Sequence, residues 1–226
     1  MTDWIDITRR NARSVQTTIG WIFWDPGAAA RYRDAVLPEA AAGPIGYIAG
    51  RCAPLAGAGA EAVIAAFGSI SPAVIRATFQ MLGSPERFRE IWDARDLAVI
   101  DGLEQYAPDI IDPLIEYGPE LWPIVEQLPL MGRVFFGAPL AMPRPAHPVL
   151  SGWHAVNCLR EWRGDTHWAL LLAAGLSHAE ASIIHNAWVG YEGDWLANSR
   201  GTAADEIERG WESLRQRGLA EDRTVL

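Results

Sequence analysis

The chain has 226 residues, half of them hydrophobic, and a formal net charge of −9. This hydrophobic content is enough for one large domain or two small ones with a buried core, which excludes a disordered chain. The negative charge disfavours a protein whose main partner is a polyanion, because duplex binding draws most of its affinity from neutralising phosphates.

All 19 basic residues are arginine. The lack of lysine excludes Schiff-base chemistry, a lysine general base and a Walker-type phosphate lysine. The two cysteines, Cys52 and Cys158, lie far apart in apolar segments with no signal peptide before them, which predicts reduced thiols in a cytoplasmic protein. No apolar run approaches the roughly 20 residues of a membrane-spanning helix, so we expect no membrane partner.

Apolar residues recur at three- and four-residue spacing, and proline or glycine marks the breaks, so the sequence predicts an all-α, mainly helical fold. The expected helices of the first part cover residues 6–23, 26–35, 45–51, 59–68, 71–82 and 84–106. A proline-rich segment at 108–148 predicts short helical pieces that alternate with loops. We place the domain junction at its end, with a helical ligand-binding domain at 1–148 and a second domain at 149–226.

The second domain should begin with a long helix from about Val149 and continue with helices at 178–188, 194–199 and 202–217. Ser177 with Glu180 forms a capping-box pattern before the first of these, and Thr202 with Asp205 forms a similar pattern before the last. Glycine follows two of the predicted helix ends, as is common at helix C-termini. The expected order is helix, short helix, longer helix.

Three short segments carry a resemblance: Leu176-Ser177-x-x-Glu180, Trp195-Leu196-Ala197 and the stretch Asp205 to Leu219. Together they resemble the winged helix-turn-helix of MarR-type regulators, which implies a DNA-binding unit with 202–217 as its recognition helix. The acidic residues Asp205, Glu206 and Glu208 in its leading turns would face phosphates with the wrong sign. The last residues leave little or no wing.

A wider resemblance rests on Gly46 to Leu55 and on the signature Leu159-Arg160-Glu161-x-Arg163-Gly164-Asp165-x-His167. These segments resemble a largely actinobacterial family of helix-turn-helix proteins of unknown function, from about residue 20 to the end. The resemblance implies a helical N-terminal part and a winged-helix-like C-terminal part. The family usually has histidine at the position of Trp162 and usually continues beyond the position of Leu226 through a wing and a further helix.

The polar residues of the signature segment are the candidate site. Helical spacing puts His154, Asn157, Cys158, Glu161 and Asp165 on one face. Arg160, Arg163 and His167 share the neighbouring face. The family resemblance adds Tyr47 and Arg51 from the segment Gly46 to Leu55. The predicted ligand-binding residues are Tyr47, Arg51, His154, Arg160, Glu161, Arg163, Asp165 and His167.

Two interpretations of this cluster stay open. Paired arginines can hold an anionic group beside a histidine and a carboxylate that transfer protons. The alternative, which we favour over catalysis, is a salt-bridge network that fixes the two halves of the protein. In that case replacing Arg160 or Asp165 by alanine should cost several kcal/mol of stability.

Aromatic and metal sites are further hypotheses. Seven tryptophans are candidates for an aromatic pocket that binds a flat ligand: Trp21, Trp24, Trp153, Trp162, Trp168, Trp188 and Trp195. Core packing explains most of them. His154, Cys158 and Glu161 share a helix face and could ligate a metal, but no Cys-x-x-Cys or His-Glu-x-x-His pattern exists, so we predict no metal. The sequence names no cofactor.

The sequence therefore predicts a ligand-binding, winged-helix-like regulatory protein with a degenerate DNA-binding surface. The alternative is a small cytoplasmic enzyme, or a metal- or small-molecule-binding protein, that uses the cluster from His154 to His167. The expected partners are a small molecule and a second copy of the chain, because winged-helix proteins commonly pair through helices. DNA is disfavoured by the charge.

Overall fold

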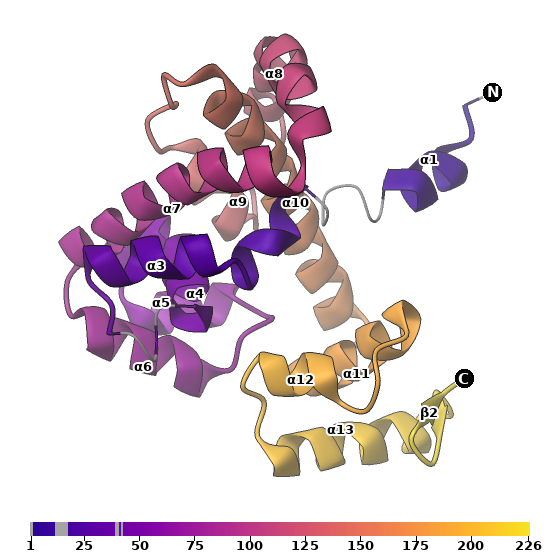
Figure 1. The fold of residues 1–226 in the computed structure, drawn as a ribbon. Helices are drawn as coiled ribbons and strands as arrows, with labels where there is room; N and C mark the ends of the chain where they lie inside the picture. Colours follow the sequence, from indigo (N-terminus) through magenta and orange to yellow (C-terminus); the bar gives the residue numbers. More distant parts are fainter. Residues whose placement is uncertain (1, 12–17, 39–40, 42) are drawn as a thin grey trace.

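The computed structural model of the chain describes residues 2–11, 18–38, 41 and 43–226. These residues are mainly helical, and their only sheet is a small two-stranded hairpin (Figure 1). The all-α prediction is confirmed. Of the helix expected at 6–23, residues 12–17 lie outside the described part. The flanking residues include helix α1 (Trp4–Asn11) and the 3-10 helix η1 (Gly20–Phe23).

The first part of the chain folds into a helical body whose helix starts follow local sequence cues. Helix α3 begins where the Asp25 carboxylate accepts hydrogen bonds from the backbone of Gly27 and Ala28, with Pro26 in the first turn. Helix α6 begins in the same way at Ser71 and Pro72. The elements are α3 (Pro26–Ala35), α4 (Pro44–Cys52), η3 (Ala53–Ala58), α5 (Ala60–Ala66), α6 (Pro72–Leu82) and α7 (Pro85–Tyr106).

Helix α7 is the centre of this body, because it packs against both α3 and α4. Its inner face carries Phe88, Ile91, Val99 and Leu103, all nearly inaccessible to solvent. Close contact is possible because glycine stands where a side chain would collide: a Cβ on Gly102 would lie 2.1 Å from the ring of Trp21.

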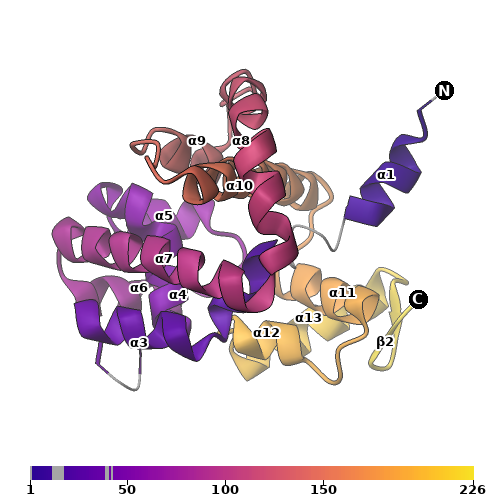
Figure 2. The same cartoon turned by 45° about the horizontal axis from the view of Figure 1, so that its top comes forward.

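The proline-rich segment differs from the prediction. After η4 (Pro108–Ile110), one continuous helix, α8 (Ile111–Glu126), contains Pro119 and Pro123, and only then follow a loop and α9 (Val134–Leu140). Tertiary packing overrides the two prolines, because α8 packs against α10. Figure 2 shows α8 crossing α10. At the closest approach a Cβ on Gly152 would lie 2.1 Å from the carbonyl oxygen of Leu114.

Helix α10 (Pro148–Ala173) is the longest element and starts where the sequence places the domain junction. Its first turns nevertheless belong to the body: Val149, Leu150 and Trp153 join the core built around α7. Ala155 and Cys158 form a second small core with side chains of α8 and α9. The division into 1–148 and 149–226 stays a prediction, and α10 is physically shared by the two parts.

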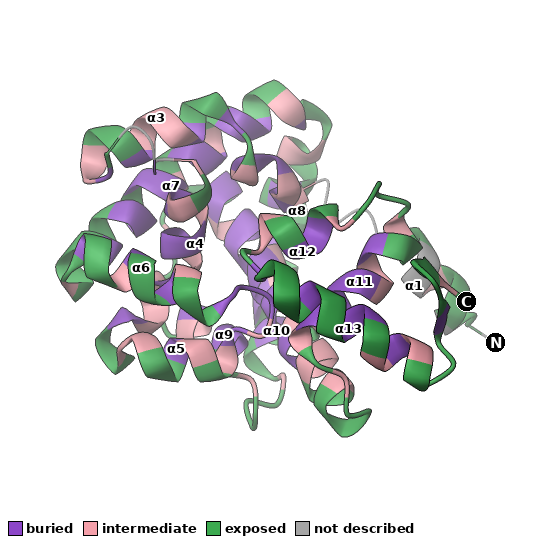
Figure 3. Cartoon of the chain, turned by 90° about the horizontal axis from the view of Figure 1, so that it is seen from below, coloured by how far each residue is buried: buried purple, intermediate pink, exposed green. Residues whose placement is uncertain are grey.

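The last part of the chain has its own core and the order of helices expected for a helix-turn-helix; we call it the helix-turn-helix unit. It comprises α11 (His178–Val189), α12 (Trp195–Ser199), α13 (Ala204–Gln216) and a hairpin of β1 (Ala220–Glu221) and β2 (Thr224–Val225). Ile183, Ile207, Trp211 and Leu214 are its main buried side chains. The outer face of α13 is exposed (Figure 3). The short hairpin fits the prediction of little or no wing.

One capping prediction for this unit is confirmed and one is wrong. Ser177 Oγ accepts from the backbone of Glu180, whose carboxylate accepts from the backbone of Ser177 at 2.7 Å. At the start of α13, however, the residue that precedes the helix is Ala203, and Glu206 accepts from its backbone. The hydroxyl of Thr202 instead forms a hydrogen bond with His178 of α11, at 2.7 Å from Nε2.

The turn before α13 is docked on the body. The backbone N–H of Ser71 donates to the carbonyl of Arg200 at 2.9 Å, and Nδ1 of His178 lies 3.0 Å from the carbonyl oxygen of Gly68. These contacts fix the first turn of α13 beside the first turn of α6. The body and the helix-turn-helix unit therefore meet at this docked turn as well as along α10.

Candidate functional site

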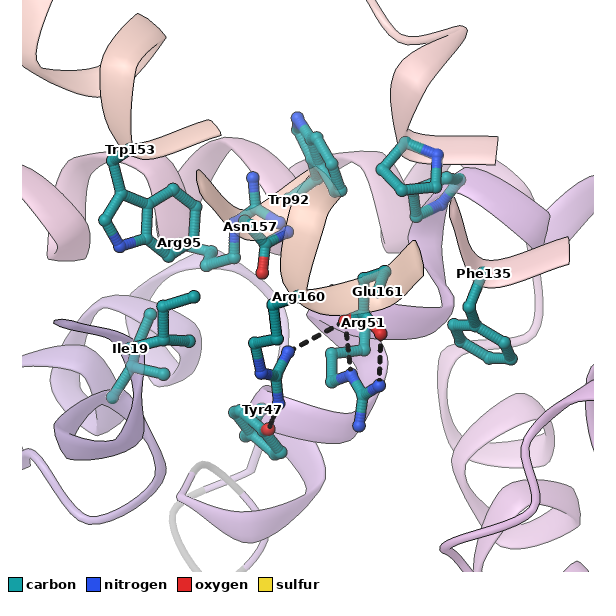
Figure 4. A pocket seen from close by; sticks show the side chains of 13 residues that line it. Ile19, Tyr47, Arg51, Trp92, Arg95, Phe135, Trp153, Asn157, Arg160 and Glu161 are labelled. Atoms are coloured by element: carbon teal, nitrogen blue, oxygen red, sulfur yellow. Dashed lines mark hydrogen bonds and ion pairs between the residues drawn. The ribbon is translucent and has the colours of Figure 1, made fainter. Parts of the chain in front are cut away.

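The centre of the site is a buried network that joins α4 to α10. Arg51 donates two hydrogen bonds to the carboxylate of Glu161, through Nε at 3.0 Å and Nη2 at 2.6 Å. Arg160 donates to the same carboxylate at 2.8 Å and to the hydroxyl of Tyr47 at 2.8 Å. Figure 4 shows the four side chains converging from the two helices. We call Tyr47, Arg51, Arg160 and Glu161 the arginine network.

Electrostatics hold this network in its charged form. Burial would raise the pKa of Glu161, but the adjacent guanidinium groups of Arg51 and Arg160 outweigh it and hold that pKa below its usual range. Burial also opposes a charged Tyr47, yet Arg160 and Arg51 lower the pKa of its hydroxyl. Glu161 is thus a carboxylate saturated by two arginines, an arrangement that suits a fixed ion pair better than a proton acceptor.

A small cavity lies beside the network (Figure 4). Its aromatic walls are Trp92, Trp153 and Phe135, and its polar walls are Arg95, Asn157 and the arginine network. The volume of the cavity is about 20 Å³, which is room for about one water molecule. The residues combine flat apolar surface with hydrogen-bonding groups, as small-molecule sites do.

Two polar groups of the cavity are unusual. The guanidinium of Arg95 lies 3.5 Å from the ring centroid of Trp92 and 5.1 Å from that of Trp153, and its ion-pair partner is the adjacent Asp96. Asn157 is only 6% exposed, and it lines the cavity. A side-chain amide can both donate to and accept from a ligand, so this residue gives the cavity a hydrogen-bonding group.

Two predicted site residues, His154 and Asp165, do not line the cavity and have structural partners. His154 is fully buried between Trp92 and Trp122, with Nε2 at 3.1 Å from the carbonyl oxygen of Pro139 and no partner for Nδ1 in the described part. Burial, aided by Arg95, lowers the pKa of His154 to about 4. Asp165 accepts a hydrogen bond from the backbone of Phe136 at 2.9 Å and so holds the start of α9.

The remaining two predicted residues lie farther along α10. Arg163 is exposed, and partial loss of solvent around its guanidinium, followed by repulsion from Arg160, lowers its pKa. Burial, followed by Arg163 and Arg200, likewise lowers the pKa of His167. The structure therefore brings together Tyr47, Arg51, Arg160 and Glu161, and separates the other predicted residues from the cavity.

Of the seven tryptophans considered for an aromatic pocket, Trp153 lines the cavity and the other six do not. Trp24 is 61% exposed and packs on Tyr106, and Trp188 and Trp195 are exposed on the helix-turn-helix unit. The sequence prediction missed Trp92 and Arg95. The sequence contains a pattern that could have identified them, because Arg95 interrupts an apolar helical stripe three residues after Trp92.

The described residues contain no group of three or more histidine, cysteine or acidic side chains that could hold a metal. The geometry does not favour the metal hypothesis for His154, Cys158 and Glu161, because Glu161 is occupied by two arginines and His154 faces a backbone carbonyl. Burial raises the pKa of Cys158 to about 12, so this thiol is not a thiolate ligand at neutral pH.

Asp165 provides a pH test of the site. Burial raises the pKa of its carboxyl to about 6 in the folded chain, against an ordinary value of 3.8. The folded state then holds a proton that the unfolded state has lost, so this group makes stability fall as pH rises from about 4 to 6. Between pH 4.5 and 7 the wild type should therefore lose about 2 kcal/mol of unfolding free energy relative to Asp165→Asn, which carries no titrating group at this position. Urea unfolding at the two pH values measures the difference. Parallel pH profiles of the two proteins would contradict the assignment.

The sequence model of a helix-turn-helix family matches residues 8–226. No curated protein and no solved structure matches the chain. No described helix is both long enough and apolar enough to cross a membrane. The family match spans the helical body as well as the three-helix unit at its end, so the chain belongs to this helix-turn-helix family.

Proposed function

We propose that the protein is a ligand-responsive, winged-helix-like regulator of the MarR type, in which the cavity beside the arginine network receives a small organic molecule. The observation that carries the proposal is the course of α10. Its first half lines the cavity with Trp153, Asn157 and Glu161, and its second half leads directly to the helix-turn-helix unit. A ligand that moves α10 therefore moves the unit that family membership links to DNA.

The lining favours a flat ligand with an anionic or hydrogen-bond-accepting group. The rings of Trp92 and Trp153 offer surfaces for stacking, and Asn157 and Arg95 offer donors. Arg51, Arg95 and Arg160 outnumber the single carboxylate of Glu161 among the groups that line the cavity. An aromatic carboxylate fits this combination of flat walls and excess positive charge.

Ligand entry requires the cavity to expand. Small-molecule sites commonly have volumes of about 300 Å³ or more, whereas the present cavity holds about 20 Å³. Arg160 is the group best placed to move, because its side chain is 14% exposed and bridges Tyr47 and Glu161. A carboxylate that replaces Glu161 as partner of Arg160 would open the wall and shift α10.

The ligand part of the proposal is tested by native mass spectrometry of the full chain purified without added ligand. We expect a bound small molecule, which is then released and identified. Asn157→Leu should lose it, whereas Gln80→Leu, the same kind of exchange at an exposed position of α6, should keep it. An empty wild-type protein that no aromatic carboxylate stabilises against heat would contradict the proposal. The same spectra test the proposed homodimer.

The DNA-facing surface predicts weak binding with little salt dependence. The arginines of α13 and the hairpin are already paired: Arg209 with Asp205, Arg215 with Glu212, and Arg223 with both Asp194 and Glu208. Few of them are free to displace counterions from phosphates. We expect the slope of log affinity against log salt to be shallower than about −3, measured by fluorescence anisotropy on duplexes selected from fragmented genomic DNA.

A charge variant makes the DNA prediction sharper. Asp205→Asn combined with Glu208→Gln releases Arg209 and weakens the hold on Arg223, so both affinity and salt dependence should rise. Glu61→Gln, which removes an equally exposed acid from the body, is the control. A tight, steeply salt-dependent complex of the wild-type chain would contradict the inference from charge.

A further inference from the structure

The turn between α12 and α13 is attached to the start of α6. The backbone N–H of Ser71 donates to the carbonyl of Arg200 at 2.9 Å. Gly201 lies so close to α6 that an added Cβ would be 2.5 Å from Cγ2 of Val74 and 3.1 Å from Oγ of Ser71. This approach requires glycine, as does the backbone angle φ of 72° at Gly201. We call residues 200–203 the docked turn.

His178, the first residue of α11, links the docked turn to the body a second time. Its Nδ1 lies 3.0 Å from the carbonyl oxygen of Gly68, and its Nε2 lies 2.7 Å from the hydroxyl of Thr202. A carbonyl oxygen can only accept, so Nδ1 carries the proton, and Nε2 of the neutral ring accepts from the hydroxyl. Thr202 is buried. The body thus holds the residues that lead into α13.

Helix α10 contacts the same part of the body. Gly68 lies in the loop between α5 and α6, and an added Cβ there would be 2.7 Å from the ring of Trp168 on α10. The loop that accepts from His178 is therefore packed against the helix that lines the cavity. A shift of α10 acts on the loop that holds the docked turn.

The docking leaves little space beside the first turn of α13. Arg76 of α6 faces Ala203, Asp205 and Glu206 across a groove of about 330 Å³, a volume at the lower end of small-molecule sites. Helix-turn-helix proteins insert the leading residues of their second helix into the major groove, which is about 12 Å wide and about 8.5 Å deep. A duplex that receives α13 in this way needs the space that α6 occupies.

We propose that the docked turn is an autoinhibitory contact: the body holds the leading end of α13 beside α6, and duplex DNA binds only after the turn is released. The inference rests on the proposed function, because it takes α13 as the helix that enters DNA. It adds the contact that must break when α10 shifts. Release breaks the hydrogen bonds from Ser71 to Arg200 and from His178 to Gly68, a number of bonds that ligand binding can offset.

A disulfide tests the proposal directly, because it keeps the turn docked. A Cβ on Gly201 would lie 3.7 Å from Cβ of Val74, a separation typical of disulfides. The full chain carrying Val74→Cys and Gly201→Cys is oxidised with glutathione disulfide or reduced with dithiothreitol. Fluorescence anisotropy then measures binding of duplexes selected on the reduced form. We expect the oxidised form to bind at least about tenfold more weakly than the reduced form.

The two redox forms are compared within one chain, so any strain from Gly201→Cys affects both. Wild type under the same two conditions is the control. Its thiols are buried, and burial raises the pKa of Cys52 and of Cys158 to about 12, so neither reacts readily at neutral pH. Equal, measurable affinity of the two forms would overturn autoinhibition and leave the DNA-binding function standing. Absence of binding by both forms would overturn the proposed function and this inference with it.

A release variant tests the same contact without a cross-link. His178→Ala removes the hydrogen bond to Gly68, so the affinity of the full chain for the same duplexes should rise by about fivefold or more. His147→Ala makes the same exchange at an exposed position of the body and should keep the wild-type affinity. Circular dichroism shows whether both variants are folded. A folded His178→Ala protein with wild-type affinity would contradict the proposal.

Hydrogen exchange measures release in the wild type. The amide of Ser71 is bonded to the carbonyl of Arg200, so the peptide that contains it should be protected in the free protein and in the oxidised variant. Saturating duplex should speed the exchange of this peptide in the wild type, because the turn has left the body. Unchanged protection of the peptide in the DNA complex would show that DNA binds the docked state, which would overturn the proposal.

Discussion

Replacing Glu161 by glutamine is expected to destabilise the protein by about 3–5 kcal/mol, the cost of leaving buried charges without their partner. Glu161 is 5% exposed on its side chain and accepts three hydrogen bonds, two from Arg51 and one from Arg160. A neutral amide removes the negative charge and turns one acceptor into a donor that faces two guanidinium groups. Urea unfolding followed by circular dichroism measures the loss.

The chain contains a matched control for this variant. Arg76 and Glu61 form a similar two-bond ion pair, at 2.8 and 3.0 Å, but both side chains are exposed. Because solvent screens such pairs, Glu61→Gln should leave the urea midpoint close to wild type. Similar midpoints for the two variants would show that burial does not set the strength of the arginine network.

Arg160→Ala separates a structural role of the arginine network from a ligand-binding role. Loss of ligand binding at unchanged stability in this variant would favour the ligand-binding role.

Replacing Gly152 by alanine is expected to destabilise the protein by about 3 kcal/mol, at the upper end of overpacking effects. The added Cβ would lie 2.1 Å from the carbonyl oxygen of Leu114, a backbone atom that can move only with α8. From the other side, a Cβ on Gly118 of α8 would lie 2.9 Å from the Cα of Gly152. Separation of α8 from α10 would also disturb the small core around Trp122 and Cys158. Thermal and urea unfolding measure the effect.

Gly164→Ala is the matched control, because it makes the same exchange in the same helix. Its Cβ would meet only the Glu161 carboxylate, at 3.8 Å, which is ordinary contact. Alanine favours the helix over glycine by up to about 1 kcal/mol, so this variant should be neutral or more stable. A Gly152→Ala protein as stable as Gly164→Ala would show that the two helices are not as tightly packed as described.

The helices and their ends were the most predictable part of the molecule. An aspartate or serine cap locates the starts of α3, α6 and α11, because its side chain satisfies backbone groups within one turn of the chain. Proline in the first turn adds to the signal for α3 and α6. Where the cue was weaker, the prediction was wrong: Thr202 bonds to His178 and leaves Ala203 at the helix start. Distant partners compete with local caps.

The candidate site was predictable only in part. Helical spacing and the family resemblance identified Tyr47, Arg51, Arg160 and Glu161, which the structure joins in one network. The same spacing could not separate Arg163 and His167 from them, because neighbouring positions on a helix can face different elements. Trp92 and Arg95 come from α7, and no local sequence pattern contains the position of α7 relative to α10.

The helical class, most helix boundaries, the use of arginine as the only basic residue and the acidity of α13 could all be read from the sequence, because they depend on composition and on contacts within a few residues. Only the packing of the helices shows which charges are paired, which side chains line the cavity and that α8 continues through two prolines. Those properties depend on burial and on contacts between distant residues, and both arise only when the helices pack.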